Sequence, residues 1–226
     1  MPNNLLIGQI FGIMIAGLIT AICLYFSYRV LPRHMGRAYQ DALNTLAAAA
    51  ETKDSGTVGH ARRVADHAVS VASSMGVKGK ELRRIEYAAL LRDIGKVNVP
   101  HRLLNKADAL TSEEWEIIKS HATLGAEMAA TVPFLAQTAD LVRHHHENWD
   151  GTGYPDGLAG EHIPLGSRIL AVTTDYDAMI SERPYHQPLT KEEAVRVMKE
   201  ESGSKYDPKV VDTFLEIVIN VLEQAA

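Results

Sequence analysis

Apolar residues recur three or four positions apart along most of the chain, the spacing that places them on one face of an α-helix. One such stripe runs through residues 60–76 and another through residues 210–222. Their apolar positions are Val64, Ala68, Val71 and Met75, then Val210, Val211, Phe214, Leu215, Val218 and Leu222. The alternation typical of β-strands is rare. The pattern therefore predicts an all-α protein.

One segment departs from this amphipathic pattern: residues 5–28 are an apolar run without a charged side chain. As a helix, these 24 residues are about 36 Å long, enough to cross a bilayer with some tilt. A buried core helix rarely runs so long without a charge. No Lys or Arg precedes the run and no small-x-small site follows it, which argues against a cleaved signal peptide. We expect one transmembrane helix within residues 1–31.

Basic residues flank this segment on one side only. Arg29, Arg33 and Arg37 follow the apolar core of the run, and no Lys or Arg precedes it. The positive-inside rule then places the N-terminus outside the cell membrane and the rest of the chain in the cytoplasm. The same arginines could contact anionic lipid headgroups.

Residues 32–55 are predicted to form a juxtamembrane helical linker, because they are rich in alanine, a strong helix former. The linker has a narrow apolar edge formed by Tyr39, Leu43, Leu46, Ala47 and Ala50. This edge either forms the seam of a homodimer or packs on the chain's own domain, and the stretch is too short for sustained heptads. The remaining residues, 56–226, fit a single domain.

Charge and cysteine content exclude several classes of protein. The net charge of −5 and the pI near 6.1 argue against a nucleic-acid partner. The single cysteine, Cys23, lies in the apolar run, so the sequence excludes both a disulfide framework and a zinc–thiolate site.

Candidate chemistry is densest in the sequence HHHENWDGTGYPDG at residues 144–157. Adjacent imidazoles and a carboxylate are donors that suit a transition metal such as iron or manganese. Other candidates precede this segment: His60 begins an amphipathic stretch, Asp93 and Lys96 end an apolar helix, and His121 lies beside a helical stripe. That stripe consists of Trp115, Ile118, Ala122, Gly125 and Ala129.

In their order, these segments resemble the HD-GYP family, bacterial phosphohydrolases that open cyclic di-GMP. The resemblance covers roughly residues 40–220 and is carried by HHE, DGTGYP, GL, IPL, RIL, DAM and RPY, which stand in sequence. It implies an HD-superfamily helical bundle, a metal-dependent phosphodiesterase, and cyclic di-GMP or a related cyclic dinucleotide as ligand. Together with the predicted transmembrane helix, it leads us to expect the chain at the bacterial inner membrane. Contact with a diguanylate cyclase through the GYP surface is a further expectation.

Phosphodiester hydrolysis explains the metal requirement, because two bridged ions supply both positive charge and a hydroxide at neutral pH. The resemblance implies two such sites that share Asp93. The second metal site takes Asp93, His121, His145 and His146, and all four are present. The first metal site takes His60, a His-Asp pair and a downstream Asp, and here the sequence departs from the family.

Two of the four ligands of the first metal site are missing. Arg92 stands where the His of the His-Asp pair is expected, and an arginine remains protonated and offers no lone pair. Thr174 stands at the downstream Asp position. Asp175 follows one residue later, which on a helix turns the side chain by about 100° and is expected to point it elsewhere. We therefore expect at most one metal ion per chain. Alternatively, Arg92 is a surface residue whose head group reaches solvent from the helix end.

The resemblance also implies roles for individual side chains. Asp93 and Lys96 are the candidate catalytic residues. The implied substrate-binding residues are Lys96, Arg92, Gly153, Tyr154, Asp177 and Arg183.

Three functions fit this combination. The first is a protein that has lost catalysis and still binds the cyclic dinucleotide. The second is a weak one-metal phosphodiesterase in which Arg92 replaces the electrostatic role of the missing ion. A guanidinium can clamp a phosphate, but it cannot lower the pKa of water to about 7 as a metal does. The third is a scaffold that uses the GYP surface for protein contacts.

Overall fold

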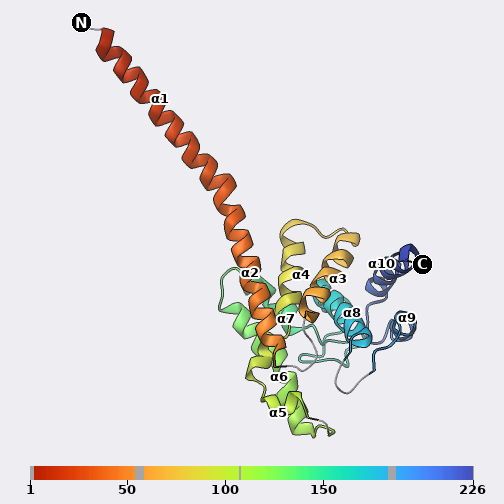
Figure 1. The fold of residues 1–226 in the computed structure, drawn as a ribbon. Coiled ribbons are helices and arrows are strands. Elements are labelled where there is room, and N and C mark those ends of the chain that lie inside the picture. The colour runs from red at the N-terminus through yellow and green to blue at the C-terminus, as the bar shows by residue number, and fades with distance from the viewer. Residues whose placement is uncertain (1–2, 54–58, 107, 183–186, 226) are drawn as a thin grey trace. The chain divides into compact units, whose positions relative to one another are not determined.

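A computed structural model describes residues 3–53, 59–106, 108–182 and 187–225, which form helices joined by loops (Figure 1). Within these ranges, β-type pairing is limited to an isolated bridge between Ser202 and Tyr206, so the prediction of an all-α protein is confirmed. The helices are α1 (Asn3–Tyr25), the π-helical η1 (Phe26–Val30), α2 (Leu31–Glu51), α3 (His60–Ser74), α4 (Gly79–Leu91), η2 (Ile94–Asn98), α5 (His101–Leu104), α6 (Ser112–Ala130), η3 (Ala136–Thr138), α7 (Ala139–Arg143), η4 (Gly160–His162), α8 (Leu165–Ile180), α9 (Lys191–Glu200) and α10 (Pro208–Ala225).

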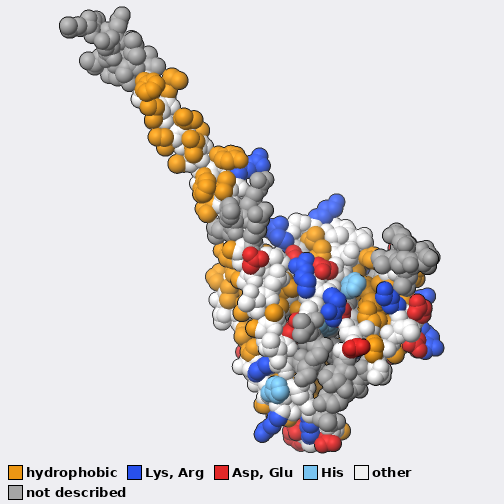
Figure 2. Space-filling model, in the orientation of Figure 1, with side chains coloured by type: hydrophobic (Ala, Val, Ile, Leu, Met, Phe, Trp, Pro, Cys, Tyr) orange, Lys and Arg blue, Asp and Glu red, His pale blue; other side chains and the backbone are white. Residues whose placement is uncertain are grey.

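The chain divides into two compact units, Met1–Ala42 and Leu43–Ala226. In the first unit, none of the side chains from Phe11 to Val30 is buried, and Figure 2 shows hydrophobic side chains along the described part of α1. This segment is a candidate membrane span by its length and composition alone.

The apolar edge predicted within the linker has two kinds of environment. Leu43, Ala47 and Ala50 are buried and belong to the second unit, whereas Tyr39 and Leu46 are exposed. Most of this edge therefore packs on the chain's own domain. The second unit begins at Leu43, inside the segment predicted as a linker.

Four helices build most of the core of the second unit. α3 packs against α4 and α8, and α10 packs against α3 and α8. The buried face of α3 includes Ala65, Ala68 and Ala72, whose small side chains allow neighbouring helices to approach closely. The predicted stripes of α3 and α10 lie in this core, with Met75 at its edge. Leu222 lies outside the side chains that the structure describes.

Helix α6 begins with a capping box: Glu114 N–H donates to Thr111 Oγ1, and Thr111 N–H donates to Glu114 Oε2. Burial along α6 starts only at His121. Trp115, the first residue of the predicted helical stripe, is 46% exposed. Its spacing fits the stripe, but the side chains in the first turns of α6 are exposed or only half-buried.

Candidate metal centre

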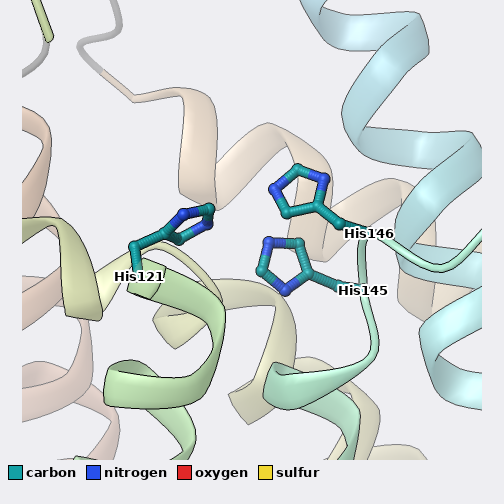
Figure 3. Close-up of side chains that lie close together, drawn as sticks. All are labelled: His121, His145 and His146. Atoms are coloured by element: carbon teal, nitrogen blue, oxygen red, sulfur yellow. The ribbon is translucent and has the colours of Figure 1, made fainter. Parts of the chain in front are cut away.

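Three histidines from two segments of the second unit meet in one place. His121 lies on α6, and His145 and His146 follow α7. One ring nitrogen of each lies within 4.8 Å of the corresponding nitrogens of the other two. Figure 3 shows the three rings gathered around a common space. The structure thus brings together three of the four residues that the sequence assigned to the second metal site.

Two of these rings have a fixed orientation and an unused nitrogen. His121 Nδ1 lies 2.7 Å from the Ile118 carbonyl oxygen, and His145 Nδ1 lies 2.6 Å from the Val142 carbonyl oxygen. Because a carbonyl only accepts, Nδ1 carries the proton in each ring and Nε2 keeps its lone pair. Both Nε2 atoms are buried without a hydrogen-bond partner among the described residues. Buried polar atoms rarely lack a partner, so the two Nε2 lone pairs are suited to binding a metal ion.

The third ring, His146, is held by the GYP turn. It stacks on Tyr154 with the ring centroids 4.8 Å apart, and Tyr154 N–H donates to the His146 carbonyl oxygen at 3.1 Å. Burial lowers the pKa of all three imidazoles, that of His146 to about 3. The rings are therefore neutral at pH 7, which is the form that binds metals.

Asp93 faces the cluster between two cations. Its Oδ1 lies 3.8 Å from His121 Nε2 and 3.0 Å from Lys96 Nζ, and its Oδ2 lies 3.2 Å from Arg92 Nη2. Burial raises the pKa of Asp93, but Lys96, Arg92 and His121 together lower it well below its ordinary value. The carboxylate is therefore charged and available as a fourth donor.

Two glycines allow these segments to meet. A Cβ on Gly95, in η2, would lie 2.0 Å from the His121 carbonyl oxygen, so glycine is required where η2 touches α6. A Cβ on Gly153 would lie 2.2 Å from Asn148 N and 2.5 Å from the His146 carbonyl oxygen. Gly153 was predicted to bind substrate. That role stays a prediction, and the structure shows a packing role that sets Tyr154 beside His146.

A cavity of about 150 Å³ adjoins the histidine cluster. It is lined by all four positions that the sequence resemblance assigned to the first metal site, His60, Arg92, Asp93 and Thr174. Its lining residues are Ala47, Ala50, Glu51, His60, Ala61, Leu90, Arg92, Asp93, Lys96, His146, Thr174, Asp175 and Ala178.

Arg92 is the largest of the fully buried side chains, with 1% of its surface exposed. The alternative of a surface arginine is therefore wrong: the head group stays inside, where Nη1 donates to the Ala89 carbonyl oxygen at 2.6 Å. A guanidinium in this position repels a cation and has no lone pair to donate. The residues of this cavity do not fit a metal ion.

Next to this cavity, His60 is positioned by Asp177. His60 Nδ1 lies 2.5 Å from Asp177 Oδ2, and Arg63 Nε donates to Asp177 Oδ1 at 2.7 Å. Asp177 is 1% exposed and both of its oxygens are engaged by His60 and Arg63, so the structure gives it a role in positioning His60. Its role in substrate binding stays a prediction. Arg63 was not predicted from the sequence, where its signal is its place one helical turn after His60.

Asp175 does not point away from the site, contrary to the expectation from its one-residue shift. It lines the same cavity as Thr174. Its carboxylate is occupied, however, because Tyr206 Oη donates to Oδ2 at 2.8 Å and Lys205 Nζ lies 2.8 Å from the same oxygen. Thr174 Oγ1 is buried without a hydrogen-bond partner among the described residues.

A second group of potential ligands, His144, Glu147 and Asp156, is used within the loop itself. The carboxylate of Glu147 accepts the backbone N–H groups of Asp156 and Leu158, and Asp156 pairs with Arg143 and His144. These bonds hold the glycine-rich turn to the end of α7. The remaining predicted substrate residue, Arg183, lies outside the described residues.

The arrangement can hold one ion through His121, His145, His146 and Asp93, with Lys96 and Arg92 behind the carboxylate. A divalent metal bound there lowers the pKa of a coordinated water and offsets phosphate charge. Lys96 and Arg92 hold Asp93 in its charged form.

The HD domain family model matches residues 44–210. A cyclic di-GMP phosphodiesterase of Thermotoga maritima is 40% identical over 179 residues, which cover 78% of this chain and 49% of that protein. The cyclic di-GMP phosphodiesterase response regulator RpfG of Xanthomonas campestris is 39% identical, with 78% and 47% covered. The chain thus spans about half the length of these relatives.

Solved structures share the fold. A cyclic GMP-AMP specific phosphodiesterase of V. cholerae superposes with a TM-score of 0.63 at 22% identity, covering 79% of this chain and 48% of that one. The PgpH HD domain of L. monocytogenes, in complex with cyclic-di-AMP, superposes with a TM-score of 0.55 at 18% identity, covering 78% and 96%. With the match of the HD domain model, the resemblance to curated phosphodiesterases and the geometry above, the chain belongs to the HD domain family and is a divergent member of its HD-GYP group.

Proposed function

We propose that the chain is a cyclic di-GMP signalling protein that binds the dinucleotide with reduced or absent phosphodiesterase activity. One observation carries this proposal: Arg92 is buried at the position where the family pattern expects a metal-binding histidine, beside His121, His145, His146 and Asp93. Relatives named cyclic di-GMP phosphodiesterase supply the ligand class.

The cofactor in this proposal is one divalent transition metal ion per chain at most, iron or manganese. The two orphaned Nε2 atoms of His121 and His145 support it, together with His146 and Asp93. Three imidazoles and a carboxylate suit such an ion, and water completes its coordination.

Reduced turnover follows if one of the two metal ions is missing. Two metals clamp both the attacking and the leaving oxygen of a phosphodiester, and one metal clamps only one of them. Arg92 supplies positive charge to the phosphate but no hydroxide. A slow one-metal hydrolase remains the second candidate function, and the observation that favours it is the position of Lys96 and Arg92 on either oxygen of Asp93.

We further propose that residues 1–31 anchor the chain in the bacterial inner membrane with the N-terminus outside, which leaves the HD domain in the cytoplasm. The uncharged run and the three arginines after it support this. The part of α2 before Leu43 would then connect the anchor to the second unit, which begins before the predicted domain boundary at residue 56. Homodimerisation through exposed linker residues, and contact between the GYP turn and a diguanylate cyclase, are further proposals that rest on the family resemblance.

The test uses the full chain in detergent, stripped of metal and then supplied with Mn²⁺ or Fe²⁺. Calorimetry measures cyclic di-GMP binding, and chromatography of the nucleotides measures turnover. We expect binding with slow or no hydrolysis, weakened by about 1–3 kcal/mol in Lys96→Ala and unchanged in the control Lys80→Ala, an exposed residue of α4. Absence of binding with every metal would contradict the proposal, as would rapid turnover.

A further inference from the structure

We propose that the cavity around Arg92 binds a terminal phosphate group, so that the chain binds a linear dinucleotide with a 5′-phosphate more tightly than a cyclic one. The inference rests on the proposed nucleotide-binding function and names the form of nucleotide that the site prefers. It follows from the misfit between this cavity and the metal that the family places there.

Unsatisfied donors line the cavity. Arg92 Nε and Nη2 are buried without a hydrogen-bond partner among the described residues, and so is Thr174 Oγ1. Nη2 lies 3.2 Å from Asp93 Oδ2, but not in hydrogen-bonding geometry. Leaving a buried charged donor unpaired is costly, and an oxyanion would satisfy all three atoms.

The acidic side chains around the cavity already have partners. Glu51 accepts the backbone N–H groups of Gly59 and Ala61 at 2.8 and 2.5 Å. Asp175 is bound by Tyr206 and Lys205.

Three carboxylates, Glu51, Asp93 and Asp175, and two cations, Arg92 and Lys96, line the cavity. Asp93 lies between both of these cations, and Lys205, outside the lining, pairs with Asp175. A divalent ion at the histidine cluster adds two positive charges beside the cavity, which a doubly charged anion would offset.

A terminal phosphate meets these conditions better than a phosphodiester. It carries a charge of about −1.5 to −2 at pH 7 and three terminal oxygens, whereas a diester carries one charge and two such oxygens. The cavity of about 150 Å³ is the size of one that holds benzene, so it accommodates a phosphate group but not a nucleoside on each side of it.

This preference bears on the reaction of the family. When water opens cyclic di-GMP, one P–O bond breaks, and the linear product carries one terminal phosphate and one free hydroxyl. A site built for the terminal phosphate would retain this product and would also receive linear dinucleotides made elsewhere.

Calorimetry on the full chain in detergent, with Mn²⁺, tests the proposal with four ligands. They are inorganic phosphate, the linear 5′-phosphorylated diguanylate, the same dinucleotide without its 5′-phosphate, and cyclic di-GMP. We expect inorganic phosphate to bind and the 5′-phosphate to strengthen dinucleotide binding by about 10- to 100-fold, the range for a charged hydrogen bond. Equal affinity with and without the 5′-phosphate would overturn the proposal while leaving the proposed function intact.

Two variants locate the effect. Arg92→Met should remove the advantage of the 5′-phosphate, whereas the control Arg83→Met, at an exposed position of the preceding helix α4, should retain it. Thr174→Val removes only the unpaired hydroxyl, so it should keep or raise the melting temperature without ligand and still weaken phosphate binding. If Thr174→Val binds phosphate as tightly as the wild type does, the proposal is wrong. Failure of cyclic di-GMP to bind, with the linear ligand still bound, would refute the proposed function alone.

Discussion

The histidine cluster and the Arg92 cavity are neighbours that share Asp93, yet they present opposite chemistry. The cluster offers buried lone pairs on His121 and His145, and the cavity offers buried donors on Arg92 and Thr174. Lone pairs suit a cation, and N–H and O–H groups suit an anion. On the proposals above, Arg92 next to Asp93 and Thr174 on α8 change the kind of ligand that this cavity accepts.

The fold tolerates Arg92 because the neighbouring side chains are held by contacts that do not involve a metal ion. His60 is held by Asp177, and Asp93 is held by Lys96 and Arg92. The cluster is built by contacts on its other side, where η2 meets α6 and the GYP turn meets the segment after α7. The loss of first-site ligands therefore leaves the second site assembled.

The largest expected effect is the loss of metal from the cluster. His121→Ala removes one of three imidazoles, and we expect the chain to retain no stoichiometric ion. The matched control, His162→Ala, changes an exposed histidine of η4 and should keep the wild-type metal content. Elemental analysis after purification measures both. Wild-type metal content in His121→Ala would place the ion elsewhere.

The second prediction concerns a double variant in which the Arg92 cavity would bind a metal ion, as the histidine cluster does. Arg92→His with Thr174→Asp restores the four-ligand pattern of the first site together with His60 and Asp93, so the double variant should bind a second ion and hydrolyse cyclic di-GMP faster than the wild type. Each single variant should do little, because the site still lacks one ligand. Metal analysis and turnover are measured together. A double variant that gains neither metal nor activity would show that the defect lies outside these two positions.

The third prediction concerns how the cluster is assembled. Gly95→Ala places a Cβ 2.0 Å from the His121 carbonyl oxygen, so η2 must move away from α6. We expect the free energy of unfolding to fall by about 3 kcal/mol, the upper part of the range for overpacking, and metal affinity to fall with it. Denaturant titration measures the change. Gly36→Ala, where the new Cβ meets nothing within 4 Å, is the control and should not destabilise the chain. An unchanged Gly95→Ala variant would contradict the close approach of η2 to α6.

The smallest expected effect is on stability at Asp177. Hydrogen bonds from His60 and Arg63 overcome the effect of burial and depress the pKa of Asp177. Its contribution to stability is therefore present above the ordinary carboxyl pKa of about 3.9 and is lost as the pH falls below it. At pH 7 we expect Asp177→Asn to cost about 1–3 kcal/mol.

The control for this variant is Asp66→Asn, at a side chain that is 58% exposed. It should change stability little. The difference between Asp177→Asn and the wild type should shrink as the pH is lowered toward 3 in denaturant titrations. A difference that stays constant between pH 7 and pH 3 would rule out the charge of Asp177 as its cause.

Local patterns in the sequence were enough to predict the helices and to single out His145 and His146, whereas the family resemblance was needed to join His121 to them. Helical periodicity depends on near neighbours along the chain, and adjacent histidines in a marked segment are visible without a structure. Asp175 shows the limit of this reasoning. Its one-residue shift along α8 suggested that the side chain points away from the site. Its partner Tyr206 is 31 residues away in the sequence, and no local pattern reveals that contact.

Asp177 and Gly153 show the same limit. The family pattern marked both as important, and only the three-dimensional contacts show that Asp177 holds His60 and that Gly153 permits a close backbone approach. Arg63 was missed because arginine on an exposed helix face is common, and its meaning depends on Asp177 from another helix.

The metal content of the wild-type chain tests the central claim most directly. The full chain, purified in detergent from cells grown with iron and manganese, is analysed for metal per polypeptide. Arg92 in the first site predicts one ion per chain or fewer, held by the histidine cluster. Two ions per chain would contradict the account, because the buried guanidinium and Thr174 would then not prevent metal binding.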